Sequence, residues 1–80
     1  MKLSFSDRAL LAIAHAPPGI RKAFYKQAAI LARDLSHPSL RAKKYNEAAD
    51  WWQARVNNDW RFYFTIEGET YRIQDVTPHP

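Results

Sequence analysis

Two arginines and two aromatic residues recur at alternating positions between residues 51 and 65, in a pattern that can hold an anion. Alternate residues of a β-strand point to the same face, and six polar or aromatic side chains would therefore share one face of a sheet: Trp51, Gln53, Arg55, Arg61, Tyr63 and Thr65. Guanidinium groups bind phosphate, and aromatic rings stack on bases. The same pattern also fits a solvated sheet face whose arginines pair with nearby aspartates, or one that a partner chain covers.

Further cations and one histidine lie close to this face in the chain. Arg41, Lys43 and Lys44 belong to a connection, residues 36–50, that we expect to bring them to the rim of the sheet. His79 follows the last expected strand, and an imidazole can act as acid or base near neutral pH. It can equally be a mobile surface histidine at a chain end. Because the histidines have no ligand spacing, we expect no metal site. Since the sequence has no glycine-rich phosphate loop, we expect no cofactor either.

The opposite, apolar side of residues 51–76 predicts an antiparallel meander of three strands. Its inward residues alternate with the polar ones: Trp52, Ala54, Val56, Trp60, Phe62, Phe64 and Ile66, followed by Tyr71 and Ile73. This period of two is typical of strands with one buried face. Asn57-Asn58-Asp59 and Glu67-Gly68 are the expected turns, the second with glycine in its second position.

Two helices are expected before the meander. Ser6 is a candidate N-cap for the first, which Pro17-Pro18-Gly19 ends. The second starts at Pro18 and ends at His37-Pro38. It buries residues at helical spacing: Ile20, Phe24, Gln27 or Ala28, Leu31 and Leu35.

The whole chain, residues 1–80, then forms one α+β domain. Leu3 and Phe5 suggest a short first strand, and Leu40 and Tyr45 are expected to point inward from the connection. The predicted order is β-α-α-β-β-β, with a helical hairpin packed on an antiparallel sheet.

Charge and cysteine content suggest a partner and a compartment. The net charge is +4, and seven Lys or Arg but one acid lie between Arg21 and Lys44, which favours an acidic or polyanionic partner. The absence of cysteine fits a reducing, cytoplasmic environment. The apolar octet 9–16 after a basic start outlines a short signal peptide, but Asp7 interrupts the basic region. No run is long enough for a membrane span.

A series of motifs along the chain resembles the RelE/ParE superfamily of bacterial toxin–antitoxin toxins. The series runs from Phe5 to His79: the basic second helix, HPSL at 37–40, Lys43-Lys44, Trp52-x-x-Arg55-Val56 and Trp60-Arg61-Phe62. The resemblance implies two helices on an antiparallel sheet, which agrees with the arrangement derived above. It also implies an acidic, partly disordered antitoxin as partner.

The resemblance implies one of two activities, mRNA cleavage or inhibition of DNA gyrase. RelE-like members cut mRNA on the ribosome without a metal. Arg61 is at the position of their phosphate-contacting arginine, and Arg55 matches the arginine of the preceding strand. Lys43, Lys44 and Arg41 could add positive charge, and His79 could act as acid or base. Independently of the resemblance, Trp51 and Tyr63 could stack on bases as sheet aromatics do in RNA-binding domains, or they could be covered by the 36–50 connection or by a partner chain. We take ribosome-dependent mRNA cleavage as the first hypothesis. It requires the Arg61 guanidinium to be free of contacts within its own chain.

ParE-like members instead inhibit DNA gyrase and cut nothing themselves. RelE-like nucleases have lysines where this chain has Trp51 and Gln53, and an arginine and a tyrosine in a C-terminal tail that has no counterpart in these 80 residues. The alternative hypothesis is therefore a non-enzymatic gyrase inhibitor, or an inactive domain that binds only its antitoxin.

Overall fold

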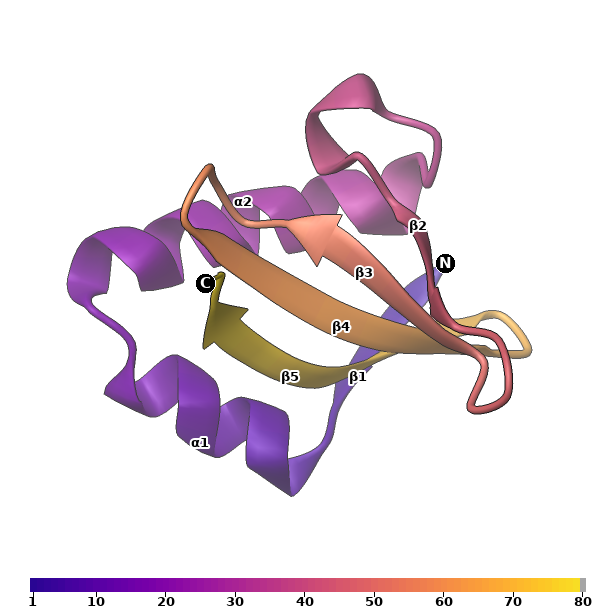
Figure 1. Cartoon of the computed structure of the whole chain (residues 1–80), viewed down its shortest axis with the longest axis horizontal. Coiled ribbons are helices and arrows are strands. Elements are labelled where there is room, and N and C mark those ends of the chain that lie inside the picture. The colour runs from indigo at the N-terminus through magenta and orange to yellow at the C-terminus, as the bar shows by residue number, and fades with distance from the viewer. Residues whose placement is uncertain (80) are drawn as a thin grey trace.

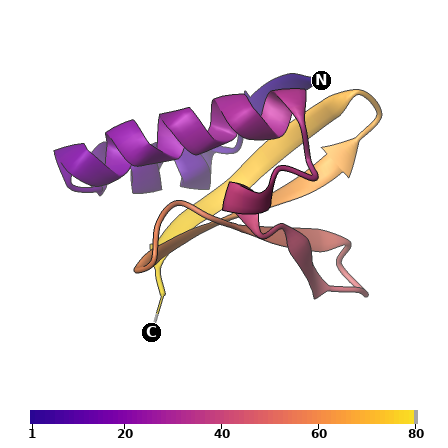
Figure 2. The same ribbon diagram turned by 90° about the horizontal axis from the view of Figure 1, so that it is seen from above.

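A five-stranded sheet carries both α-helices on one of its two sides, and the other side is free of helices (Figures 1 and 2). The computed structural model describes residues 1–79. The elements along the chain are β1 (Lys2–Phe5), α1 (Asp7–His15), α2 (Pro18–Arg33), the 3₁₀ helix η1 (Pro38–Leu40), β2 (Lys43–Asn46), β3 (Trp51–Arg55), β4 (Trp60–Glu67) and β5 (Thr70–Pro78). The strand order is β1-β5-β4-β3-β2. Only the β1–β5 pair is parallel among these strands. The predicted α+β class is confirmed.

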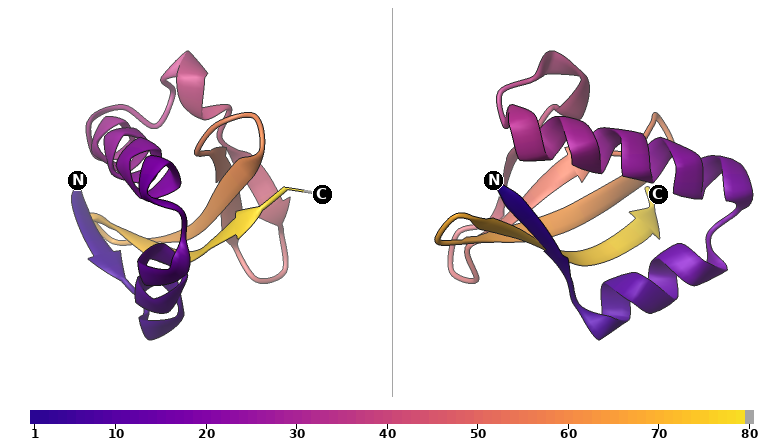
Figure 3. Two further views of the ribbon diagram at one scale, coloured as in Figure 1. Left: turned by 90° about the vertical axis from the view of Figure 1, so that its left-hand side faces the viewer. Right: turned by 180° about the vertical axis from the view of Figure 1, so that it is seen from behind.

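The two helices run in opposite senses and diverge from the short proline connection between them (Figure 3). Helix α1 begins where expected, because the Ser6 hydroxyl accepts a hydrogen bond from the backbone N–H of Ala9. Helix α2 starts at Pro18 as predicted but ends at Arg33, earlier than the His37-Pro38 stop. Asp34 accounts for the difference, since its carboxylate accepts from the Ser36 N–H and so offers the backbone an alternative to another helical turn.

The predicted meander is present, but its turns are made differently. Gly68 has a φ of 63° and follows the last residue of β4, so it takes the first rather than the second position of the loop. In the 57–59 turn no residue has positive φ. The Asn57 side chain closes that turn instead, by accepting from the backbone N–H groups of Asp59 and Trp60.

Strand β2 was not predicted, and it corrects the interpretation of residues 36–50 as a plain connection. All four of its residues are exposed at the sheet edge, so no apolar alternation marks it in the sequence. Leu40 is fully buried as expected. Tyr45 is not pinned inward: 58% of it is exposed, and its ring packs edge-on against Tyr63 at 4.9 Å.

The core lies between the helices and the inward face of the sheet. Phe24 of α2 meets Phe62 of β4 with ring centroids 5.4 Å apart. Every meander residue predicted to point inward belongs to the core cluster or packs against it. Neither described helix is long and apolar enough to cross a membrane.

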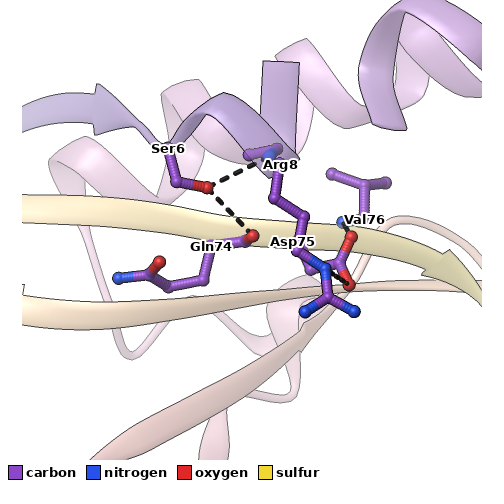
Figure 4. Close-up of polar contacts among 6 residues, drawn as sticks. Ser6, Arg8, Gln74, Asp75 and Val76 are labelled. Carbon is purple, nitrogen blue, oxygen red and sulfur yellow. Dashed lines mark hydrogen bonds and ion pairs between the residues drawn. The ribbon is translucent and has the colours of Figure 1, made fainter. Parts of the chain in front are cut away.

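A bulge in β5 fixes the start of α1 to the sheet (Figure 4). The pairing between β4 and β5 shifts at Tyr63/Phe64, which leaves Gln74 as the extra residue. The Ser6 hydroxyl donates to the Gln74 carbonyl at 3.0 Å. Arg8 Nε, from the first turn of α1, lies 3.2 Å from the Asp75 carboxylate. These contacts place Arg8 next to the helix-free face of the sheet.

Candidate nucleic-acid interface

A cationic cleft lies at the end of the sheet where β3, β4 and the C-terminal residues meet. It has a volume of about 320 Å³ and is lined by Arg41, Lys43, Gln53, Ala54, Arg55, Arg61 and His79. The structure therefore brings together most of the residues proposed from the sequence, although they come from separate segments of the chain. No acidic side chain is among these lining residues.

Backbone geometry and strand pairing position the cations of the cleft. Arg41 follows η1 with a φ of 46°, a left-handed conformation that turns the chain into β2. Lys43 pairs across the sheet with Gln53, and Arg55 pairs with Arg61. The backbone N–H of His79 donates to the Asp59 carbonyl at 2.7 Å, which fixes the histidine beside the 57–59 turn.

Like charges converge on Arg55. Its partial removal from water and the positive charges of Arg41 and Arg61 lower the pKa of the Arg55 guanidinium below its usual value. An arginine keeps its charge in spite of such a shift. A bound anion would relieve the repulsion, so the electrostatics of the cleft favour an anionic ligand.

Arg61 does not have the free guanidinium that the sequence interpretation required. Only 8% of the residue is exposed, and Nη1 donates to the backbone carbonyls of Asn57, Asn58 and Trp60 at 2.8, 3.2 and 3.0 Å. The side chain folds back on the neighbouring turn because the Asn57 and Asn58 carbonyls have no backbone donor there, whereas the Trp60 carbonyl also accepts from the Val56 N–H. Arg61 thus stabilises the turn and adds charge to the wall of the cleft, and the exposed cations are Arg41 and Lys43, with Arg55 half-buried.

Lys44 lies apart from the cleft. Its partner across the sheet is Trp52, an inward-facing residue, and its ammonium lies 5.4 Å from the Trp52 ring centroid. It also forms an ion pair with Asp50. The two lysines of the Lys43-Lys44 pair therefore point to opposite faces of β2, as successive strand residues must.

Trp51 and Tyr63 lie on the helix-free face next to the cleft rather than in it. Their ring centroids are 6.2 Å apart, and Tyr45 also packs against Tyr63. Together with Arg8, Asp75 and Thr77, the three rings line a second hollow of about 290 Å³. Sequence reasoning missed Tyr45, and recognition of β2 as a strand in register with β3 could have found it.

Across residues 1–79, no group of three or more His, Cys, Asp or Glu side chains converges to hold a metal ion. The chemistry available to the cleft from its own residues is therefore that of cations, amide groups and one imidazole.

Comparison with known proteins identifies the fold. No family model and no curated protein matches the sequence. Among solved structures, a YoeB/ParE toxin from Agrobacterium tumefaciens matches with a TM-score of 0.82 and 12% identity over 100% of both chains. An archaeal RelE–RelB complex from Pyrococcus horikoshii OT3 matches with a TM-score of 0.78 and 16% identity, over 96% of this chain and 92% of that one.

The toxin–antitoxin complex RelBE2 from Mycobacterium tuberculosis is similar as well. Its TM-score is 0.79 at 24% identity, over 98% of this chain and 96% of that chain. The chain therefore has the fold of the RelE, YoeB and ParE toxins over essentially its full described length, and the resemblance noted in the sequence is confirmed for the fold.

Proposed function

We propose that this protein is the toxin of a toxin–antitoxin pair and that it inhibits translation by cutting mRNA on the ribosome. The observation that carries the proposal is the cleft itself. Arg41, Lys43 and Arg55 converge with His79 and no carboxylate, on the fold that RelE and YoeB toxins share. Such a surface attracts a polyanion by charge and holds its phosphates through guanidinium and ammonium donors.

The reaction proposed is attack of a ribose 2′-oxygen on its own phosphate. A bond forms from that oxygen to phosphorus while the bond to the 5′-oxygen breaks, which leaves a cyclic phosphate and a free 5′-hydroxyl. Arg55 and Lys43 stabilise the negative charge that grows on the phosphate oxygens. His79 is the imidazole in the cleft. It takes the proton from the attacking 2′-hydroxyl and delivers a proton to the leaving 5′-oxygen.

Cleavage through Arg61, the form in which the sequence hypothesis was stated, is contradicted by the intrachain contacts of its guanidinium, so the present proposal rests on Arg55 instead. The charge of Arg61 contributes to the potential of the cleft, but its contacts with the 57–60 backbone make it a positioning residue. We assign the principal phosphate contact to Arg55, the residue that pairs with Arg61 across strands β3 and β4.

A translation reaction tests the proposal. Purified protein should generate new mRNA ends that map to ribosome-bound codons, and Arg55→Ala should reduce their formation by about 10²-fold, as for other single donors to a developing anion. Lys26→Ala changes an exposed cation of α2 and is the matched control. Unchanged cleavage by Arg55→Ala would remove the proposed mechanism.

The second candidate is a non-enzymatic inhibitor of DNA gyrase. The burial of Arg61 favours it, because the buried arginine leaves the cleft with fewer free donors for catalysis. A supercoiling assay separates the two candidates, since a gyrase inhibitor would change supercoiling or trap cleaved DNA, whereas a ribosome-dependent nuclease would do neither.

The expected partner is an acidic, partly apolar antitoxin that is disordered when free. The basic stretch 21–44 provides charge for it, and Leu10, Leu11 and Tyr25 leave apolar surface exposed on the helices, at 51%, 62% and 53%. Induction of this protein should arrest growth, and coexpression of the adjacent gene should restore it. No rescue, together with no acidic protein in a pull-down, would contradict this pairing.

A further inference from the structure

We infer that Tyr45, Trp51 and Tyr63 form a base-stacking platform that holds a single-stranded RNA segment whose phosphates lie in the cationic cleft. The inference deepens the proposed function and rests on it, because it divides one RNA site into a charged part and an aromatic part. The two hollows that define these parts lie next to each other on the helix-free face.

The three rings hold one another in place. Tyr63 is the central ring, with Tyr45 edge-on at 4.9 Å and Trp51 tilted by 38° at 6.2 Å. Such edge-on and tilted contacts fix the orientation of the rings relative to one another. Tyr45 is 58% exposed, and Trp51 and Tyr63 are half-buried, so the platform is both rigid and accessible.

The platform and the cleft are joined through β3. Trp51, Gln53 and Arg55 alternate on one face of this strand, so Trp51 and Arg55 are separated by about 13 Å along it. Gln53 lines the cleft and pairs across the sheet with Tyr63. A small anion cannot span this distance. A single-stranded RNA segment can, because it presents successive phosphates to the cleft and bases to the rings.

The one acid among the described residues that line the second hollow does not repel such an RNA segment. Asp75 is almost buried, with one carboxylate oxygen accepting from the Val76 N–H and the other lying 3.2 Å from Arg8 Nε (Figure 4). The Arg8 side chain is 75% exposed, so its remaining donors face solvent beside the rings. The platform therefore carries a cation at its rim, which suits a polyanion.

Binding of a single-stranded RNA hexamer in the absence of ribosomes tests the inference. The fluorescence of Trp51 should be quenched on binding, and Trp51→Phe should remove that quenching while the affinity stays within a few fold. Tyr45→Ala and Trp51→Ala should each weaken binding by about tenfold without changing its salt dependence. Lys43→Ala should instead reduce the salt slope by about one. Tyr25→Ala removes an exposed tyrosine of α2, away from the helix-free face, and as the matched control it should leave RNA affinity and its salt dependence unchanged.

Three outcomes would overturn the inference. They are equal affinity of the Tyr45→Ala and wild-type proteins, equal affinity for the hexamer and for inorganic tripolyphosphate, and tighter binding of an acidic peptide than of RNA on the same residues. Circular dichroism confirms that each variant is folded, and Tyr45 is exposed enough for its loss to be tolerated.

Failure of this inference can be distinguished from failure of the proposed function. Ring-dependent RNA binding without mRNA cleavage would reject the chemistry alone, and cleavage with ring-independent RNA binding would reject the platform alone.

Discussion

Arg55 and Arg61 face each other as a cross-strand pair between β3 and β4. Like charges at such a position destabilise a sheet unless each finds compensation. The Arg61 guanidinium donates hydrogen bonds to three backbone carbonyls, and the Arg55 guanidinium donates one to the Asn58 side-chain oxygen at 3.2 Å. The pair thus divides into one arginine that holds the turn and one that remains available to a ligand.

Replacement of Arg61 should reduce stability more than any other substitution in the cleft. Arg61→Ala leaves the Asn57 and Asn58 carbonyls without their side-chain donor, whereas the Trp60 carbonyl keeps its bond from the Val56 N–H, and the expected cost is about 1–3 kcal/mol in the free energy of unfolding. Urea unfolding followed by fluorescence measures the change. A variant as stable as the wild-type protein would show that these contacts contribute nothing.

Arg55→Ala should reduce RNA binding and cleavage but not stability, in contrast to Arg61→Ala. Removal of this cation relieves the repulsion from Arg41 and Arg61, so the free energy of unfolding should stay close to the wild-type value. RNA affinity and mRNA cleavage should fall. Parallel unfolding and binding curves provide the test, and a large loss of stability would assign Arg55 a structural role instead.

Inorganic phosphate should stabilise the protein through the same cleft. At a phosphate concentration tenfold above its Kd, the free energy of unfolding should rise by about 1.4 kcal/mol. Thermal melts in phosphate and in chloride at equal ionic strength separate specific binding from general screening. The Arg41→Ala/Lys43→Ala double variant should be equally stable in phosphate and in chloride. If phosphate still stabilises this variant, the anion binds outside the cleft.

The parts of the fold that bury one face were predictable from the sequence. Trp52, Ala54, Phe62 and Phe64 alternate with polar residues because the helices cover only one side of the sheet. Ser6 marked the start of α1 through a local rule about unpaired N–H groups.

The remaining features depend on contacts that no local pattern carries. Strand β2 buries none of its residues, so it has no period to detect. The bulge at Gln74 changes the register of β5 and is set by its partner strand. Arg61 lies on the polar face as expected, but its burial follows from where the carbonyls of the 57–60 turn point. The composition of the cleft was thus predictable, whereas the division of roles within it was not.

Gln27 should prove to be a structural link between the helices and the cleft. Its buried amide donates to the carbonyls of Ser39 and Arg55 at 3.2 and 3.0 Å. Gln27→Leu keeps the volume but leaves both carbonyls unpaired, which should cost about 1–3 kcal/mol and weaken RNA binding through displacement of Arg55. Lys26→Leu, at the preceding exposed position of α2, is the control. Equal stability of the two variants would contradict this role.

The ion pair between Lys44 and Asp50 should give stability a specific dependence on alkaline pH. The hydrogen bond to Asp50 raises the pKa of Lys44 above its ordinary value of 10.5, against a smaller opposing effect of desolvation. A cation with a raised pKa in the folded state stabilises the protein fully below its unfolded-state value, and this contribution is lost as pH rises through the folded-state value. The difference in unfolding free energy between the wild-type protein and Lys44→Met should therefore be constant between pH 7 and 9 and shrink above about pH 10.5. Asp50→Asn should abolish the dependence, because it removes the carboxylate that raises the pKa. A difference that is flat through this alkaline range would show that the pair does not form in solution.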